Sequence, residues 1–339
     1  MLIKNSVGNI NRPHWSGLKS RVDKINTGWF PLDRNENSDT IYRQQLVDII
    51  QNKIDLSKAT QYEDYLDYYT ALSNLWNIST DSILITGGCD EAIRLSFESS
   101  LTEKSRYLSL QPTYRGAETN AVDLNPQFLY SDEDELSIEQ SLCANMGISV
   151  FYWCTPNNPS GITYSLDFVE SQVRKHIQTL FFIDNTYDDF TDENYHSLIK
   201  YPNVLIGKSF SKSWGLAGQR MGALLGHPNL IQAITNIRPI MSVSSVTLQV
   251  VKYLTENYTI VQDTIDRNRA GIGYIYNFFS KCDIQSQPNV NHIVCRLPEQ
   301  FNDMLNQQKL LVAHLPGGYT RMTTMPEQDF KNVCLNTFR

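Results

Sequence analysis

The sequence predicts an α/β protein built on a sheet with helices on both faces. Six short apolar segments have the length of strands and lie near residues 83–86, 106–110, 148–153, 179–184, 203–208 and 220–225. Polar or amphipathic stretches of helical length alternate with them, which is the order expected of a sheet wound with helices. At 339 residues the chain is long enough for about two domains.

We expect four parts along the chain. An N-terminal arm, 1–45, precedes a large domain, 46–240. Apolar residues at helical spacing predict a helical link over 241–281, kinked or broken near Gly271 and Gly273. Residues 282–339 are expected to form a smaller domain of a few strands and a final helix from Pro326 to Phe338, against which the N-terminal arm packs.

Composition excludes several classes of protein. Lys and Arg number 29 against 36 Asp and Glu, a net charge of −7 with no basic run, which argues against a nucleic-acid partner. The first 20 residues lack the apolar core of a secretion signal, and no apolar stretch has the length of a membrane span. The six cysteines and six histidines are dispersed without metal-ligand spacing. We therefore expect a cytoplasmic protein with reduced thiols and no metal site.

The segment 209–220, SFSKSWGLAGQR, limits the chemistry most tightly. A lysine that forms a Schiff base with a carbonyl needs a fixed position and a lowered pKa. The permanent cation of Arg220 would favour a neutral amine on Lys212 and offers a planar fork suited to phosphate oxygens. The hydroxyls of Ser209 and Ser211 can donate to the same anion. Such Ser-Lys-Ser clusters also occur in solvated loops, so evidence from other segments is needed to tell a Schiff-base site from an ordinary loop.

A carboxylate ends the apolar strand in TLFFIDNTY, 179–187. Asp184 stands at the carboxyl end of that strand, where open α/β sheets place ligand groups, and Tyr187 follows three residues later. A carboxylate beside a pyridine nitrogen keeps that nitrogen protonated. Standing alone, however, Asp184 would be read as the cap of a turn.

Three further strand ends carry turn or anion-binding signals. CTPNNPSG, 154–161, follows an apolar strand and predicts a turn. In ILITGGCDEAI, 83–93, a strand runs through two glycines into a helix whose first amides and dipole form an anion site. QPTY, 111–114, ends in an aromatic side chain, Tyr114, that can stack on a flat ring.

Together these segments resemble the fold-type I pyridoxal 5'-phosphate (PLP) enzymes, and within them the class I/II aminotransferases similar to histidinol-phosphate aminotransferase. The resemblance covers nearly the whole chain in order. It implies a large domain with a mostly parallel, mixed sheet and a smaller α+β domain formed by the N-terminal arm and the C-terminus. It also implies that Lys212 forms the Schiff base and moves protons, that Asp184 faces the pyridine nitrogen, and that Tyr187 donates to the phenolic oxygen of PLP.

The resemblance assigns further residues by their positions. Asn158 is expected to bind the phenolic oxygen, Tyr114 to stack on the ring, and the side chain of Asp90 to cap its helix. The implied cofactor-binding set is Gly88, Cys89, Asp90, Tyr114, Asn158, Asp184, Tyr187, Ser209, Ser211, Lys212 and Arg220, with Tyr62 reaching across a homodimer to the neighbouring subunit's phosphate. Tyr65 is an alternative to Tyr62.

The substrate side rests on Arg321 in the strand YTRMTT, 319–324, which matches the family arginine that holds the α-carboxylate of an amino acid. The loop LDRNEN, 32–37, places Asn35 in the same pocket. Three features depart from the family pattern. Ser38 replaces a proline, and residues 323–325 replace the glycine that often follows the arginine strand. The strand 310–315 also lacks the arginine that binds the phosphate of histidinol phosphate, which leaves His314 as its candidate replacement.

The implied activity is transfer of an amino group between an amino acid and a 2-keto acid through Lys212. Two alternatives stay open. One is an amino acid decarboxylase resembling threonine-phosphate decarboxylase, because the same residues serve either reaction. The other is a catalytically silent protein that keeps the fold.

Overall fold

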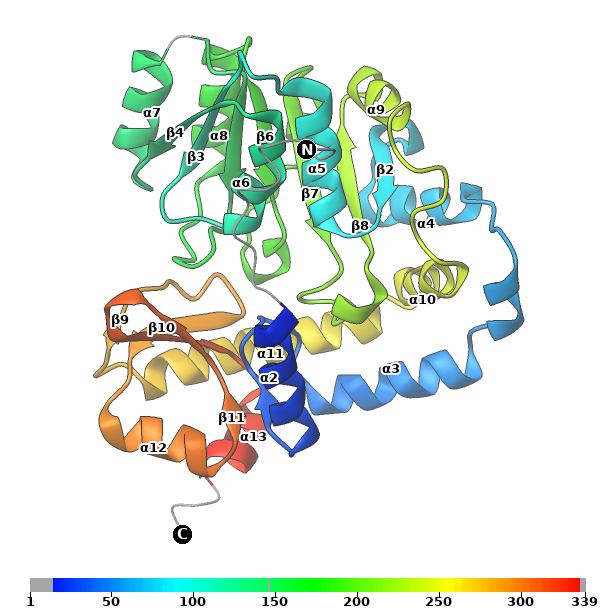
Figure 1. Ribbon diagram of the computed structural model, residues 1–339. Helices are drawn as coiled ribbons and strands as arrows, with labels where there is room; N and C mark the ends of the chain where they lie inside the picture. The colour runs from blue at the N-terminus through cyan, green and yellow to red at the C-terminus, as the bar shows by residue number, and fades with distance from the viewer. Residues whose placement is uncertain (1–14, 146, 336–339) are drawn as a thin grey trace.

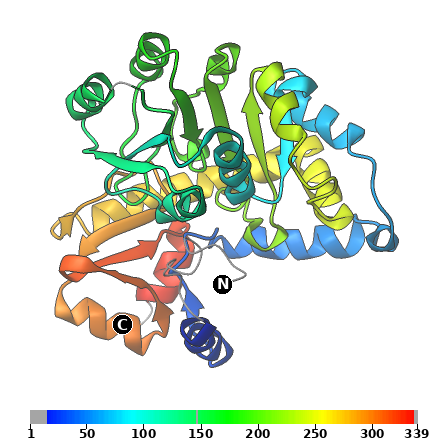
Figure 2. The same cartoon turned by 45° about the horizontal axis from the view of Figure 1, so that its top comes forward.

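The computed structural model describes residues 15–145 and 147–335 and organises them around a large and a small sheet (Figures 1 and 2). The large sheet has seven strands in the order β2-β8-β7-β6-β5-β3-β4. Their bounds are β2 Ile83–Thr86, β3 Arg106–Leu110, β4 Gln127–Ser131, β5 Val150–Cys154, β6 Leu180–Asp184, β7 Val204–Ser209 and β8 Gly222–Gly226. Only β8 runs antiparallel to its neighbours, so the sheet is mixed but mostly parallel, as the sequence predicts.

The six expected strands are all present, and β4 is an additional one. β4 was missed because it lies at the edge of the sheet, where only the last of its five residues, Ser131, is buried. The central strands β5, β6 and β7 are buried except at one terminal residue of β6 and one of β7, since helices cover both faces. One core cluster is covered by α5 Cys89–Ser100, α6 Arg115–Ala121 and α9 Pro228–Thr235, and the other by α4 Leu66–Trp76, α7 Glu135–Ala144, α8 Leu166–Lys175 and α10 Ser245–Glu256.

The small sheet is antiparallel and forms in the last part of the chain. Its order is β12-β13-β10-β9, from β9 Asp283–Ile284, β10 His292–Arg296, β12 Ala313–Leu315 and β13 Tyr319–Thr323. Beside it, β1 Phe30–Pro31 pairs in parallel with β11 Leu310–Leu311, so a segment near the N-terminus joins residues close to the C-terminus. The remaining α-helices are α2 Trp15–Asn26, α3 Thr40–Asn52, α11 Thr259–Phe278, α12 Glu299–Gln307 and α13 Glu327–Phe330.

Short helical turns connect these elements. Turns of the 3-10 type cover Leu56–Thr60, Thr80–Ser82, Val122–Leu124, Asp188–Phe190, His196–Lys200, Ala217–Gln219 and Pro316–Gly318, and a π-helical turn covers Lys331–Leu335. No helix in the described ranges is long and apolar enough to cross a membrane.

Two expectations about helices are corrected. The expected kink near Gly271 and Gly273 is wrong, because α11 runs unbroken past both glycines. A Cβ at position 271 would lie 2.1 Å from the backbone oxygen of Met325, so this glycine allows close packing of the helix instead of breaking it. The final helix is also shorter than expected: α13 ends at Phe330 and passes into the π-helical turn, and Phe338 lies outside the described residues.

Candidate active site

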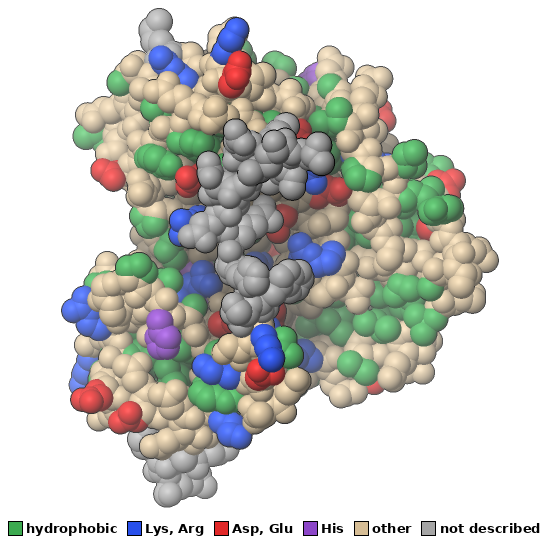
Figure 3. All heavy atoms as spheres, in the orientation of Figure 1, with side chains coloured by type: hydrophobic (Ala, Val, Ile, Leu, Met, Phe, Trp, Pro, Cys, Tyr) green, Lys and Arg blue, Asp and Glu red, His purple; other side chains and the backbone are tan. Residues whose placement is uncertain are grey.

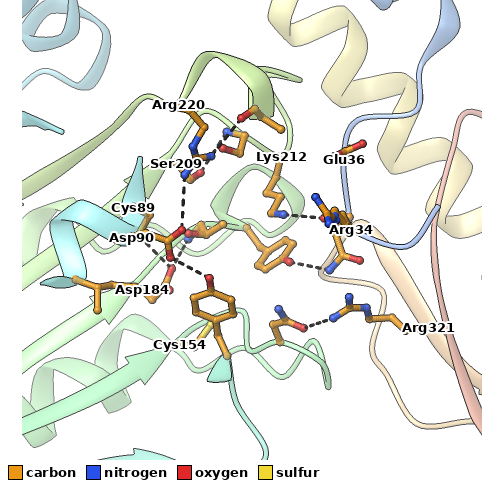
Figure 4. Close-up of a pocket in the computed structure, with 18 residues that line it drawn as sticks. Arg34, Glu36, Cys89, Asp90, Cys154, Asp184, Ser209, Lys212, Arg220 and Arg321 are labelled. Atoms are coloured by element: carbon orange, nitrogen blue, oxygen red, sulfur yellow. Dashed lines mark hydrogen bonds and ion pairs between the residues drawn. The ribbon is translucent and has the colours of Figure 1, made fainter. Parts of the chain in front are cut away.

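A pocket of about 570 Å³ opens at the edge of the large sheet where β5, β6 and β7 end (Figure 4). Parallel strands present their carboxyl ends at one edge, so the residues that follow these strands meet there. All of the predicted site residues line this pocket except Gly88, Tyr62 and the candidate His314. Arg34, Glu36, Ile93, Cys154, Thr186 and Ala217 also line it and were not singled out from the sequence.

Lys212 lies in the middle of the pocket, with Arg220 and Ser209 on one side and Arg321 on the other (Figure 4). Its amine donates a hydrogen bond to the backbone oxygen of Arg34 at 3.1 Å. Burial lowers the pKa of Lys212 to about 8, and the cations of Arg321 and Arg220 act in the same direction. The lowered pKa was expected, but desolvation, and not Arg220, is its largest cause.

The loop that carries Lys212 is fixed by contacts outside the pocket. The Tyr42 hydroxyl donates to the backbone oxygen of Trp214 at 2.9 Å, and the Ser213 hydroxyl donates to the carboxylate of Asp189. Gly215 adopts a φ of 64°, and a Cβ there would lie 2.9 Å from the Tyr42 ring. The lysine therefore stands on a loop anchored by buried side chains.

One end of the pocket is suited to a phosphate group. α5 begins after Gly88 without a side-chain cap, so its first backbone amides remain available to an anion. Gly88 has a φ of 91°, and a Cβ there would lie 2.8 Å from Nη2 of Arg220. The guanidinium thus lies directly against the helix start, beside Ser209 and Ser211. This combination of cation, hydroxyls and helix amides fits a phosphate dianion.

Asp90 does not cap α5 as expected. Its carboxylate accepts a hydrogen bond from the Tyr114 hydroxyl at 2.9 Å and lies 3.6 Å from Arg220. The N-cap residue is Gly88, so Asp90 is the second residue of the helix. Its side chain lines the pocket. Asp90 therefore links the arginine to Tyr114.

Asp184 is a deeply buried carboxylate at the end of β6, with 3% of its surface exposed. Its Oδ2 accepts a hydrogen bond from the Tyr152 hydroxyl at 2.6 Å, and its Oδ1 accepts one from the backbone N–H of Thr186 at 3.1 Å. Burial raises the pKa of Asp184, and hydrogen bonds from Thr186 and Tyr152 oppose that rise. Tyr152 was not singled out because it lies within an otherwise apolar strand.

The other end of the pocket gathers Asn35, Tyr187, Asn158 and Arg321. The Asn35 amide donates to the Tyr187 hydroxyl at 2.9 Å. Arg321 donates to Asn158 Oδ1 at 3.4 Å and to the backbone oxygen of Asp33 at 3.0 Å. Arg321 Nε and Asn35 Oδ1 are buried without a hydrogen-bond partner among the described residues. Buried polar atoms are normally paired, so this end of the pocket fits a polar ligand.

Two predicted tyrosines lie away from the pocket. Tyr62 is 90% exposed. Tyr65, its alternative, is buried and donates to the backbone oxygen of Val243 at 2.8 Å, which gives it a role in its own subunit.

His314 does not reach the pocket, so the expectation that it replaces a phosphate-binding arginine there is wrong. In the pairing of β12 with β13, Ala313 is opposite Arg321 and His314 is opposite Thr320. Successive strand residues point to opposite faces, so His314 and Arg321 face different sides of the sheet. His314 instead lines a separate cavity of about 240 Å³ beside Trp29 and Lys24.

Comparison with known proteins places this geometry in context. The sequence profile of the family described as "Aminotransferase class I and II" matches residues 27–334. A histidinol-phosphate aminotransferase of Methanosphaera stadtmanae is 28% identical over 216 residues, which cover 61% of this chain and 58% of that protein. Alignments with three such relatives span 58% to 66% of their lengths, less than two thirds of each.

Two solved structures share the fold at low sequence identity. The histidinol-phosphate aminotransferase of Sinorhizobium meliloti in complex with pyridoxal-5'-phosphate has a TM-score of 0.83 and 14% identity, covering 98% of this chain and 95% of that one. The L-threonine-O-3-phosphate decarboxylase of Porphyromonas gingivalis has a TM-score of 0.76 and 17% identity, covering 91% and 98%.

Proposed function

The chain belongs to the family of class I and II aminotransferases, and on that premise we propose that it is a PLP-dependent aminotransferase that exchanges an amino group between an amino acid and a 2-keto acid. The observation that carries the proposal is the position of Lys212. Its amine, with a pKa of about 8, stands between a phosphate-suited end at Arg220 and a carboxylate-suited end at Arg321.

The residues of the pocket fit PLP. Arg220, Ser209, Ser211 and the first amides of α5 would hold its phosphate, and Asp184 would face its ring nitrogen. Tyr114 would lie against the ring, while Asn158 and Tyr187 would bind the phenolic oxygen. The close approach of Gly88 to Arg220 and the buried unpaired atoms of Asn35 and Arg321 support this arrangement. When bound, PLP supplies an electron-poor ring that takes up the electron pair released at the substrate α-carbon.

The side chains of the chain then have separate tasks. Lys212 Nζ, with its lowered pKa, would take the proton from the substrate α-carbon and deliver it to the aldehyde-derived carbon of PLP. The Tyr187 oxygen accepts from Asn35, so its own proton remains available for donation into the pocket. Arg321 binds the α-carboxylate through its guanidinium, whose planar fork matches a carboxylate.

A spectral experiment tests the proposal. Purified protein supplied with PLP should show a long-wavelength absorption band, which should be absent from Lys212→Ala. Borohydride reduction followed by peptide mapping should place the cofactor on Lys212. Lys208 is a matched internal control. It lies on β7, just before the loop that carries Lys212, and is also buried with a pKa lowered to about 7, yet it pairs with Asp188 outside the pocket. Labelling of Lys208, or no labelling of Lys212, would contradict the proposal.

The reaction type is tested by adding single amino acids to the PLP-loaded protein. Transamination predicts conversion to the pyridoxamine form together with release of a keto acid, and recovery of the original spectrum when a keto acid is added. Release of carbon dioxide without any keto acceptor would identify a decarboxylase instead.

A homodimer is a further part of the proposal, with Tyr62 reaching the neighbouring subunit's phosphate end. Exposed apolar side chains lie on α3, at the start of the turn Leu56–Thr60, at the start of α4 and between α9 and α10: they are Ile41, Val47, Leu56, Leu66, Ile237, Ile240 and Met241. Apolar surface gathers over α3 and α10 in the space-filling view (Figure 3). Contiguous exposed patches of this kind mark interaction sites. Light scattering should give twice the chain mass, and Ile240→Glu should reduce it, whereas a monomeric wild type would contradict the dimer.

We also propose a cytoplasmic location. Cys89, Cys143, Cys154, Cys282 and Cys295 are free thiols, which supports a reducing compartment.

A further inference from the structure

Asp184 is held in the interior without a cationic partner in the part of the chain that the structure describes. The titratable groups that interact with it are the thiols of Cys89 and Cys154, the phenols of Tyr107, Tyr114, Tyr152 and Tyr187, and the carboxylate of Asp90. None of these groups carries a positive charge. A buried carboxylate in such surroundings remains ionised only where hydrogen bonds stabilise its charge.

The Tyr152 hydroxyl makes the shortest of these hydrogen bonds. It donates to Oδ2 at 2.6 Å, whereas Oδ1 receives the Thr186 N–H at 3.1 Å and the Cys89 thiol at 3.8 Å. A donor at this distance from a carboxylate makes a charge-assisted bond, which is stronger than a bond between neutral groups. Tyr152 therefore stabilises the charge of Asp184 and also fixes the rotation of its carboxyl group.

Strand pairing brings the two side chains together. In the parallel pair β5–β6, Tyr152 is opposite Phe182 and Cys154 is opposite Asp184. Residues two apart on a strand share a face, so Tyr152 and Asp184 are diagonal neighbours on one face of the sheet. Tyr152 is fully buried and only 3% of Asp184 is exposed, so water competes little for this hydrogen bond.

We propose that Tyr152 is a positioning residue for the cofactor: its hydroxyl keeps Asp184 ionised and turned so that the carboxylate can bind the ring nitrogen of PLP. The proposal rests on the function proposed above, since it concerns the same pocket. Tyr152 does not line the pocket, so it acts through Asp184 and makes no contact with substrate.

A purely structural role for Tyr152 is the competing explanation, because its ring packs against Phe97 and Phe182 in the core. Tyr107 provides a matched control for that role. It is equally buried on the neighbouring strand β3, packs edge-to-face on the same Phe97 and makes no hydrogen bond to Asp184. Loss of its hydroxyl should therefore affect only the core.

The test measures binding of two ligands to cofactor-free protein by spectral titration. One is PLP and the other is an analogue in which a C–H group replaces the ring nitrogen. Tyr152→Phe should weaken binding of PLP roughly 10- to 100-fold, the range expected for a hydrogen bond to a charged group, and leave binding of the analogue unchanged. Tyr107→Phe should leave the binding of both ligands unchanged.

Each other outcome is decisive. Equal loss of affinity for PLP and the analogue, or the same loss in Tyr107→Phe, would show that Tyr152 is structural and overturn the inference. Normal PLP binding by Tyr152→Phe would also overturn it. A wild type that binds neither ligand would instead refute the proposed function.

A second measurement covers the case in which Tyr152→Phe does not fold. A fluorinated tyrosine placed at position 152 keeps the ring and makes its phenol a better donor. It should tighten PLP binding without affecting the analogue, and unchanged PLP binding would overturn the inference.

Discussion

Asn35 offers the sharpest test of how the loop 33–35 organises the pocket. It combines two features: a left-handed backbone with a φ of 55°, and an amide that donates to the Tyr187 hydroxyl at 2.9 Å. Its backbone N–H also donates to the Thr323 hydroxyl at 2.9 Å, and its backbone oxygen accepts from Asn291. Asparagine tolerates the left-handed region, whereas alanine is strained there.

The backbone conformation and the hydrogen bond predict different losses in the free energy of unfolding for different substitutions of Asn35. Removal of the amide leaves a buried phenol without its donor, which costs about 1–3 kcal/mol. In Asn35→Ala the left-handed backbone adds roughly 1–2 kcal/mol, whereas Asn35→Gly adopts that backbone freely. We therefore expect the free energy of unfolding to fall by about 2–5 kcal/mol in Asn35→Ala, and by roughly 1–2 kcal/mol less in Asn35→Gly because the backbone strain is absent. Urea denaturation of the three proteins measures the difference.

A third variant separates the backbone from the hydrogen bond. Asn35→Asp keeps the size and the backbone preference but replaces the amide donor with an acceptor, so the Tyr187 proton turns away from the pocket. We expect kcat of Asn35→Asp to fall about tenfold, which corresponds to a loss of about 1.4 kcal/mol of transition-state stabilisation. Equal stability of the alanine and glycine variants would refute the backbone argument, and a wild-type kcat in Asn35→Asp would refute the role given to the amide.

Three further predictions concern the phosphate end, the lysine and the helix α3. Gly88→Ala brings a Cβ to 2.8 Å from Arg220 at a φ of 91°, so PLP binding measured by spectral titration should weaken at least tenfold; unchanged binding would contradict the phosphate site. Because the lysine pKa is lowered to about 8, the amine loses its proton above that pH, and the rate of PLP capture should rise with pH to half its maximum near 8. Arg321→Gln removes a cation that lowers this pKa, so the midpoint should move upward, and a fixed midpoint would argue against that coupling. Asp39 is fully buried and accepts a hydrogen bond at 2.7 Å from the partly exposed Arg267 of α11. Asp39→Ala should therefore lower the free energy of unfolding by about 1.5–3 kcal/mol in urea denaturation, and a loss below about 0.5 kcal/mol would contradict this contribution.

The sequence alone determined the class of fold and most of the pocket. Apolar runs of strand length are local signals, and four of the six expected strands contain the observed strand or match it within one residue at either end. The runs near 148–153 and 220–225 each begin two residues before the observed strands, β5 and β8. The predicted cofactor residues follow strand ends, and parallel strands place those ends at one edge of the sheet. Lys212, Asp184 and Asn158 could therefore be assigned to one pocket before their separation in space was known.

Local patterns failed where a residue's role depends on its partner. Gly271 reads as a helix breaker in the sequence, but a backbone oxygen more than 50 residues later in the chain makes glycine necessary there. His314 reads as a substitute for a phosphate-binding arginine, but the register of β12 against β13 turns it to the other face. Edge strand β4 has too little buried surface to produce an apolar run.

The tertiary structure decided the contacts that tune the pocket. Tyr152 becomes a partner of Asp184 through the pairing of two strands, and Asn35 becomes a partner of Tyr187 across a separation of 152 residues. Periodicity and turn chemistry act over a few residues and can identify Lys212 as the centre of the site. The hydrogen bonds that set the charge and orientation of the groups around it depend on register and packing, which no local pattern in the sequence encodes.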